Sequence, residues 1–237
     1  MDNTSVQAYV YTALRNSILC LQLKPGTAVS TQEIATKLSV SRTPVREAFI
    51  RLQRDGLVDI YPQKETVISR INLKRIQQER FIRESLECAN IDAIIRKGGP
   101  HDFSALYRNL EEQKRVLAEE HPDGFAFFTI DNEFHRMLFA LSGQELSAQV
   151  IADTNTHYTR VRLVTLGNME IAKASILEHE MILSEIESNL AELARGHIRN
   201  HLHRLENEID AFVKEYPDYF ETGEEPSPNR MGSFIPL

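Results

Sequence analysis

The sequence lacks tryptophan, and only two of its 237 residues are cysteines. Cys20 and Cys88 lie far apart and form no C-x-x-C pair, so we expect free, buried thiols in a reducing compartment. No apolar run approaches the roughly 18 residues that a membrane-spanning helix needs. The N-terminus also lacks the basic start and apolar core of a secretory signal. We therefore predict a cytoplasmic protein without a membrane partner.

Acidic residues exceed basic ones, and the formal net charge is −7, but the charge is unevenly distributed. Residues 1–75 contain 11 Lys and Arg against 6 Asp and Glu, whereas the remainder contains 16 against 28. This asymmetry indicates a basic module for a polyanion, joined to an acidic module with another task. We divide the chain into a basic head at 1–72, a helical domain at 73–218 and a tail at 219–237. Turn-forming residues are frequent in the tail, which we expect to be poorly ordered.

The basic head shows the pattern of three helices followed by a hairpin. Apolar spacing predicts a helix over 6–20, and the S-x-x-E sequence that begins at Ser30 predicts the start of a second. A third helix is expected to begin near Arg42 and to end at Gly56. Two stretches of alternating polarity then flank residues 62–65, as in two short strands. This order predicts a winged helix-turn-helix.

The second helix of a helix-turn-helix enters the major groove of DNA with its N-terminal end. Arg42 and Arg46 are spaced i, i+4 on one face of the predicted helix, where they could bind guanine or clamp a phosphate. Ser41, Thr43 and the first backbone N–H groups suit phosphates, and Lys64 lies at the predicted hairpin tip. An exposed arginine is also typical of an ordinary solvated face. For Arg51 and Arg54, which lie further along the helix, a solvated face is about as good an interpretation as contact with DNA.

The acidic part of the chain has helical apolar periodicity and no strand pattern. The predicted helices cover roughly 73–97, 103–120, 123–142, 145–166, 169–189 and 190–215. The expected fold is therefore mainly α, with an N-terminal winged helix-turn-helix and a C-terminal antiparallel all-α bundle.

Four residues of the predicted bundle could form a metal site. Asp131 and His135 are spaced i, i+4, and His179 and His201 each have apolar neighbours that could turn them inward. One carboxylate and three imidazoles suit a divalent transition ion, and three histidines can also serve a catalytic zinc. A lone helical histidine is more often a surface or hydrogen-bonded core residue, and D-x3-H occurs by chance. We assign to that alternative His101, His121 and His157.

The basic head resembles a known DNA-binding domain. The segments LKPGT, STQEIATKL, SVSRTPVREAFIRL and DGLV, within roughly 6–70, are similar to that of the GntR family of bacterial transcription regulators. Many members have a basic residue where Gln32 stands, and a wing glycine where Glu65 stands, so a base contact and the wing geometry could differ. The predicted DNA-binding set comprises Ser41, Arg42, Thr43, Arg46, Lys64 and Gln32.

Residues 75–215 resemble the FCD ligand-binding domain of the FadR-type branch of that family. The resemblance rests on ERFIRESLECANIDAI, on the D-x3-H pair, on the histidine of the EH sequence and on a histidine late in the last long helix. It implies an antiparallel bundle that binds a divalent metal, zinc or nickel, through Asp131, His135, His179 and His201.

The same resemblance implies a small organic acid effector whose carboxylate reaches the metal. Arg83 has a planar fork suited to a carboxylate, and a salt bridge to Glu87 is nearly as good an interpretation of it. Arg162 is a weaker pocket candidate. Gln144 stands where the family often has asparagine, and we include it as the third predicted effector residue.

These features predict a homodimeric, ligand-responsive transcription regulator that binds a palindromic double-stranded DNA operator. We do not expect an enzyme. Two alternatives remain, a regulator that senses the metal itself and a metal-dependent hydrolase in which the cluster activates water. The hydrolase is less favoured because no further general base has clear spacing and because it leaves the DNA-binding head unexplained.

Overall fold

The computed structural model describes residues 3–221, which divide into two compact units. The head unit extends to Leu73 and also includes the chain from Tyr216 onward, whereas the helical unit comprises Lys74–Glu215. Among the helices of residues 3–221, none combines the length and apolarity that crossing a bilayer requires. Each unit is described by itself below.

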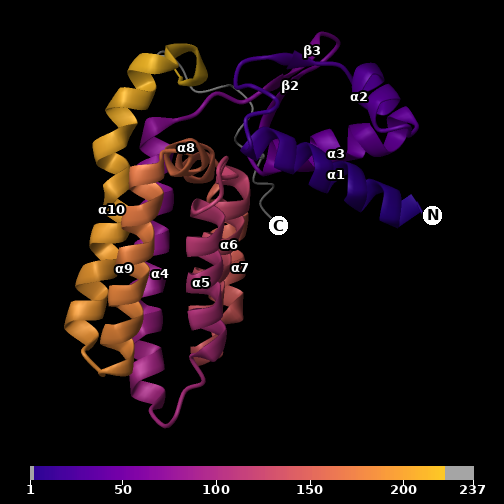
Figure 1. Ribbon diagram of the computed structural model, residues 1–237. Helices are drawn as coiled ribbons and strands as arrows, with labels where there is room; N and C mark the ends of the chain where they lie inside the picture. The colour runs from indigo at the N-terminus through magenta and orange to yellow at the C-terminus, as the bar shows by residue number, and fades with distance from the viewer. Residues whose placement is uncertain (1–2, 222–237) are drawn as a thin grey trace, which may run out of the picture. The chain divides into compact units, whose positions relative to one another are not determined.

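The head unit is a winged helix-turn-helix, which confirms the predicted class of this domain (Figure 1). Its helices are α1 (Asn3–Leu19), α2 (Thr31–Lys37) and α3 (Arg42–Arg54), and its strands are β1 (Ala28–Val29), β2 (Val58–Tyr61) and β3 (Glu65–Ile68). The antiparallel sheet has the order β1-β3-β2, and Thr66 of β3 faces Val29 on one side and Ile60 on the other. We did not predict β1, because two residues are too short to show an alternating pattern.

Local sequence signals explain the ends of the head helices. The Ser30 hydroxyl accepts the backbone N–H of Glu33 at 3.1 Å, which confirms the predicted cap of α2. Gly56, just beyond α3, has φ +72°, a left-handed conformation that glycine adopts without strain. The apolar faces of the three helices and the sheet form one buried core, which includes Val10, Leu14, Ile18, Ile34, Val45, Phe49, Leu52, Leu57 and Ile68.

A short C-terminal segment, Tyr216–Glu221, pairs with the end of the wing, contrary to the boundary that we placed after residue 218. Ile71 donates its N–H to the Tyr219 carbonyl at 2.7 Å and accepts the N–H of Glu221 at 3.0 Å. Phe220 is buried between these two contacts. The pairing satisfies both backbone groups of Ile71 and draws residues 219–221 into a defined position. The rest of the predicted tail, 222–237, lies outside the described residues.

The helical unit is a bundle, as predicted, and comprises α4 (Leu73–Lys97), α5 (Ser104–Leu117), α6 (Gly124–Ser142), α7 (Glu145–Thr154), α8 (Thr156–Leu166), α9 (Met169–Glu187) and α10 (Ala191–Glu215). A one-turn 3-10 helix follows at Pro217–Tyr219. Helix α9 packs against α10 and α5, and α5 packs against α6. The shorter α8 crosses the bundle and contacts α6, α9 and α10 (Figure 1). Residues from α6, α9 and α10 therefore meet in the interior.

The single helix predicted over 145–166 is wrong, because the chain breaks at Asn155. This residue has φ −82° and ψ 64°, between the end of α7 and the start of α8. The carboxylate of Glu79 in α4 accepts the N–H groups of His157 and Tyr158, both at 2.9 Å. A buried carboxylate at a helix N-terminus satisfies N–H groups that have no intrahelical partner. Since this cap comes from a distant helix, the local spacing of residues could not reveal the break.

Candidate metal centre and nucleic-acid interface

The recognition helix presents its polar N-terminal end outward. All six residues of the predicted DNA-binding set are exposed, and they lie at the starts of α2 and α3 and at the tip of the wing: Gln32, Ser41, Arg42, Thr43, Arg46 and Lys64. Ser41 is the N-cap of α3, and its hydroxyl makes no capping hydrogen bond. Arg46 lines a groove together with Ile50 and with Tyr61 and Lys64 of the wing. This surface joins the recognition helix to the wing.

The other two arginines of α3 differ in their surroundings. Arg51 lies over the ring of Tyr11, with its guanidinium carbon 3.7 Å from the ring centroid, and the Tyr11 hydroxyl donates to Asp55 at 2.6 Å. Arg54 is exposed in the last turn. Glu65 is exposed at the start of β3. The contact of Arg51 with α1 favours a structural role for this residue.

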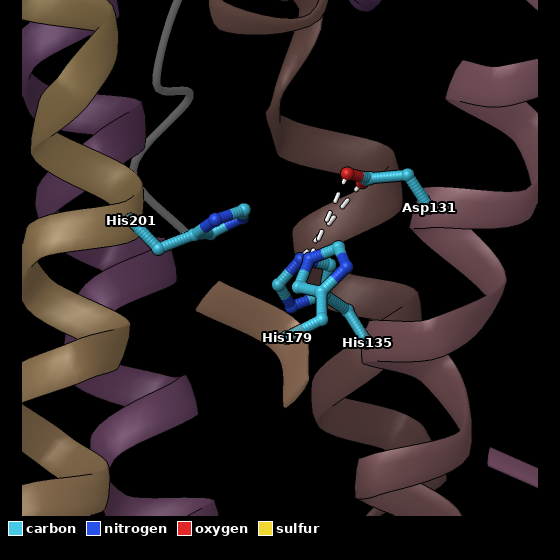
Figure 2. Close-up of side chains that lie close together, drawn as sticks. All are labelled: Asp131, His135, His179 and His201. Atoms are coloured by element: carbon cyan, nitrogen blue, oxygen red, sulfur yellow. Dashed lines mark ion pairs between the residues drawn. The ribbon is translucent and has the colours of Figure 1, made fainter. Parts of the chain in front are cut away.

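Asp131, His135, His179 and His201 come together in the interior of the helical unit (Figure 2). The first two lie on successive turns of α6, and the other two come from α9 and α10. One ligand-type atom from each residue lies within 4.8 Å of the other three. All four side chains are buried, Asp131 and His179 completely. The structure thus assembles the four residues that the sequence predicted as metal ligands.

Within residues 3–221, several of the atoms that face the centre of this cluster have no hydrogen-bond partner. The Nε2 atoms of His135 and His179 and the Oδ1 atom of Asp131 are buried without a hydrogen bond, whereas Asp131 Oδ2 forms an ion pair with Arg162. The Nε2 atoms lie 3.9 and 3.7 Å from the nearest Asp131 oxygen, too far for a hydrogen bond. Each buried unsatisfied polar group costs about 1–3 kcal/mol, so such a group is rarely retained without a partner. One oxygen and three nitrogen donors in this arrangement would suit a divalent transition ion.

The outer nitrogen of each histidine is held by an acceptor from a neighbouring side chain. The pairs are His135 Nδ1 with Glu87 Oε2 at 2.8 Å, His179 Nδ1 with Gln113 Oε1 at 3.0 Å, and His201 Nδ1 with Glu178 Oε2 at 2.8 Å. An acceptor at Nδ1 fixes the proton there and leaves Nε2 free for a metal. Burial holds the pKa of His179 and of His201 well below the ordinary value, so both imidazoles are neutral near pH 7.

Arg83 makes the salt bridge that the sequence offered as its alternative role. Its Nε donates to Glu87 Oε1 at 2.6 Å, and both side chains are buried. Burial opposes ionisation of Glu87, but His135 and Arg83 outweigh it and hold the pKa of this carboxyl below its usual range. Arg83 therefore supports the predicted ligand His135 through Glu87. A contact between Arg83 and an effector stays a prediction.

Arg162 of α8 lies beside the metal-ligand cluster. It forms an ion pair with Asp131 and donates to Asn132 Oδ1 at 2.7 Å. It also lines a small pocket with His201 and Arg204. The third predicted effector residue, Gln144, is exposed at the N-cap of α7, and its role stays a prediction.

Sequence reasoning missed the residues that support the ligands. Gln113 carries no motif, and only its place on the amphipathic α5 suggested that it would be buried. Glu178 precedes His179 in the EH sequence, yet it bonds to His201 of another helix. His157, which we predicted to be a surface or hydrogen-bonded core residue, is buried and accepts a hydrogen bond from Arg160 at 2.8 Å.

A winged helix-turn-helix joined to a helical domain is the architecture of a DNA-binding transcription regulator. The family described as "Bacterial regulatory proteins, gntR family" matches residues 7–68, and "FCD domain" matches residues 80–204. The chain is 32% identical over 213 residues to an HTH-type transcriptional regulator in an unstable DNA locus of Streptomyces ambofaciens, covering 90% of this chain and 89% of that protein. It is 26% identical to the HTH-type transcriptional repressor RspR of Escherichia coli K12, covering 91% and 93%.

Solved structures share the fold. Escherichia coli McbR/YncC superposes with a TM-score of 0.72 at 19% identity, covering 89% of this chain and 98% of that one. A GntR regulator from Rhodococcus gives 0.71 at 23% identity, covering 87% and 98%. The chain belongs to the GntR family of bacterial transcription regulators and carries an FCD domain. It is a DNA-binding transcription regulator, and its relatives bear the names of regulators rather than enzymes.

Proposed function

We propose that this regulator responds to a small organic acid that binds beside a divalent transition metal in the helical unit. Asp131, His135, His179 and His201 would hold zinc or nickel. The observation that carries this proposal is the buried four-residue cluster in which the Nε2 atoms of His135 and His179 face Asp131 without a hydrogen bond. When bound, such an ion provides a Lewis-acidic position that can accept a carboxylate oxygen.

The surroundings of the cluster suit an acidic ligand. Arg162 and Arg204 line the adjoining pocket, and the polar side chains of Tyr158 and Ser175 line it too. A guanidinium fork can bind a carboxylate with two parallel hydrogen bonds. Arg162 is the nearer candidate, because it already pairs with the carboxylate of Asp131. The acid would thus lie between the proposed metal site on one side and an arginine side chain on the other.

The head would bind DNA as part of a homodimer. Arg42 and Arg46 would read the major groove, Ser41 and Thr43 would bind phosphates, and Lys64 would contact the DNA from the wing. A two-fold dimer matches a palindromic operator. Control of transcription requires the acid to bind one arrangement of the dimer better than another, and DNA affinity must respond reciprocally.

The metal site is tested by His179→Ala, with His203→Ala as the matched control. His203 also lies in the helical unit but is half-exposed and pairs with Glu84 and Glu206. We expect His179→Ala to lose the bound metal, and His203→Ala to keep it, in elemental analysis and native mass spectrometry. The circular dichroism of both variants should stay helical. An unchanged metal stoichiometry in His179→Ala would show that the four-ligand site is wrong.

A regulator that senses the metal itself is the alternative, since four protein ligands can hold an ion without an acid. A gel shift with the metal-loaded protein distinguishes the two. We expect a panel of mono-, di- and hydroxycarboxylic acids to include one that releases DNA, while removal of the metal by a chelator leaves DNA bound. Release by the chelator alone, with no response to any acid, would favour metal sensing.

A further inference from the structure

Two buried amides of α5, Asn109 and Gln113, link the ligand His179 to the backbone of α6. We propose that they form a relay that fixes the proton of His179 on Nδ1, which makes both amides positioning residues of the metal centre. The consequence for metal binding rests on the proposed function. The consequence for the histidine proton stands on the geometry of the protein alone.

The relay is a continuous chain of three hydrogen-bond contacts. Asn109 Nδ2 donates to the backbone carbonyl of Ile130 at 2.9 Å, and Gln113 Nε2 donates to Asn109 Oδ1 at 2.7 Å. Gln113 Oε1 then lies 3.0 Å from His179 Nδ1. Gln113 and His179 are completely buried, and Asn109 is 7% exposed. Ile130 directly precedes Asp131, so the chain begins beside one ligand and ends on another.

The direction of the relay follows from its first acceptor. A backbone carbonyl has no proton, so Asn109 must turn its NH₂ group toward Ile130 and its oxygen toward Gln113. Gln113 must in turn donate its NH₂ group to that oxygen and present its own oxygen to His179. Only an imidazole with its proton on Nδ1 can donate to this oxygen. The lone pair of His179 Nε2 then faces the cluster, as metal coordination requires.

The other two ligand histidines need no such anchor. Glu87 and Glu178 accept hydrogen bonds at both oxygens, so either orientation of the carboxylate holds the proton on Nδ1 of His135 or His201. An amide accepts at only one end, and a half-turn of Gln113 would present a donor to His179. The Asn109 contact makes this half-turn unfavourable, because it would place two acceptors face to face.

The amide also serves His179 without adding a buried charge. Glu87 is paired with Arg83, and Glu178 is paired with Arg204. A further carboxylate at this depth would need a further cation, because an unpaired buried charge is strongly unfavourable. The amide relay gives the same proton position with no counterion.

Asn109→Leu tests the relay, because leucine of similar size removes the anchor but leaves Gln113 in place. Gln113 should then turn in part of the molecules, and the proton of His179 should move to Nε2. Nitrogen NMR of the full-length, metal-free protein with labelled histidine rings reports this proton position directly. His179→Ala assigns the signal. We expect the wild-type protein to show the Nδ1–H form and Asn109→Leu to show a substantial Nε2–H population.

Asn90→Leu is the matched control, because Asn90 is also a buried amide of this unit but accepts from Ser142. It should leave the His179 proton on Nδ1. The relay is overturned if Asn109→Leu keeps the wild-type form, or if Asn90→Leu changes it equally.

Metal affinity gives the second readout. Competition of Zn²⁺ between the protein and a chromogenic chelator should show about a 10–100-fold weaker affinity for Asn109→Leu, in the range typical of such supporting residues. Asn90→Leu should bind as the wild type does. If the wild type bound no metal, the proposed function would fail, while the NMR result would still decide the relay. Equal affinities of Asn109→Leu and the wild type would overturn the role of the relay in metal binding.

Discussion

At the scale of single residues, the sharpest functional prediction concerns Arg46. This side chain is exposed on α3 and lines the groove between the recognition helix and the wing. A bidentate arginine–guanine contact contributes about 1–3 kcal/mol of discrimination. We therefore expect Arg46→Ala to lower the preference for the operator over scrambled DNA by roughly 10–100-fold. Fluorescence anisotropy at one fixed salt concentration measures both affinities, with an operator obtained by binding-site selection.

Arg54→Ala is the control for this prediction. Arg54 carries the same charge and is exposed on the same helix, but it lies in the last turn. Its loss should weaken binding to both DNAs about equally, because it removes a non-specific electrostatic attraction. If Arg46→Ala kept the wild-type preference for the operator, our placement of the recognition surface would be wrong.

The clustering of Asp131, His135, His179 and His201 was predictable from the sequence, but the side chains that hold the outer nitrogens of the histidines were not. Asp131 and His135 follow a helical spacing, and the apolar neighbours of His179 and His201 indicated buried faces. Which side chain meets each Nδ1 depends on how α5 and α9 pack and on the rotamers that this packing selects. Gln113 is one polar residue among many on its helix, so nothing in the spacing distinguishes it. The relay became visible only when three helices were placed together.

At the scale of secondary-structure elements, the start of α8 depends on Glu79. Its carboxylate accepts the N–H groups of His157 and Tyr158, and the side chain is completely buried. Glu79→Ala would leave both groups buried without this partner, and we expect the free energy of unfolding to fall by about 1–3 kcal/mol. Urea denaturation measures the loss. Hydrogen exchange at these two amides should accelerate as well.

Arg75→Ala provides a comparison for Glu79→Ala. Arg75 donates to Glu79 at 3.1 Å, but its side chain is half-exposed. Exposed ion pairs contribute about 0–1 kcal/mol, so this variant should lose less stability and should keep the amides of α8 protected. Equal protection of His157 and Tyr158 in Glu79→Ala and in the wild type would show that the cap does not hold the start of α8.

The helices show how much of the secondary structure can be predicted from the periodicity of apolar residues. The helix predicted over 73–97 coincides with α4, and the cap at Ser30 has the geometry that its S-x-x-E sequence predicts. The break at Asn155 escaped because no glycine or proline marks it within 145–166. The cause of the break lies in Glu79, 76 positions earlier in the chain. Local patterns identify a helix, whereas a tertiary cap decides where it divides.

At the scale of the whole molecule, the charge asymmetry and the change from strands to helices were enough to predict two units of different task. The return of the chain to the head unit was not predictable. It includes a backbone bridge between Ile71 and Phe220 and a hydrogen bond from Arg70 to the Asp218 carbonyl, neither of which has a periodic signal. The chain leaves the head unit after Leu73 and returns to it at Tyr216. The bridge therefore links the segment that ends at Leu73 to the segment that begins at Tyr216.

Phe220→Ala tests whether this bridge holds the C-terminal segment. Phe220 is 4% exposed and Ile71 is completely buried. Loss of the ring should detach the C-terminal segment from Ile71. The free energy of unfolding should then fall by no more than the roughly 3–5 kcal/mol that is typical when a fully buried phenylalanine is replaced by alanine. Hydrogen exchange should show faster exchange at the amide of Ile71, which donates to Tyr219.

Phe220→Ala should also reduce the effect that an acid bound to the helical unit has on the DNA affinity of the head unit. Helix α10 carries the predicted ligand His201 and ends at Glu215, immediately before the segment that pairs with Ile71. A ligand that shifts α10 can therefore act on the head through the chain itself. We expect Phe220→Ala to bind DNA but to show a smaller ratio between its DNA affinities without and with the effector acid. Asp218→Ala should keep the wild-type ratio, because Asp218 contacts Arg70 through its backbone carbonyl. A wild-type ratio in Phe220→Ala would mean that the signal reaches the DNA-binding head without the C-terminal segment.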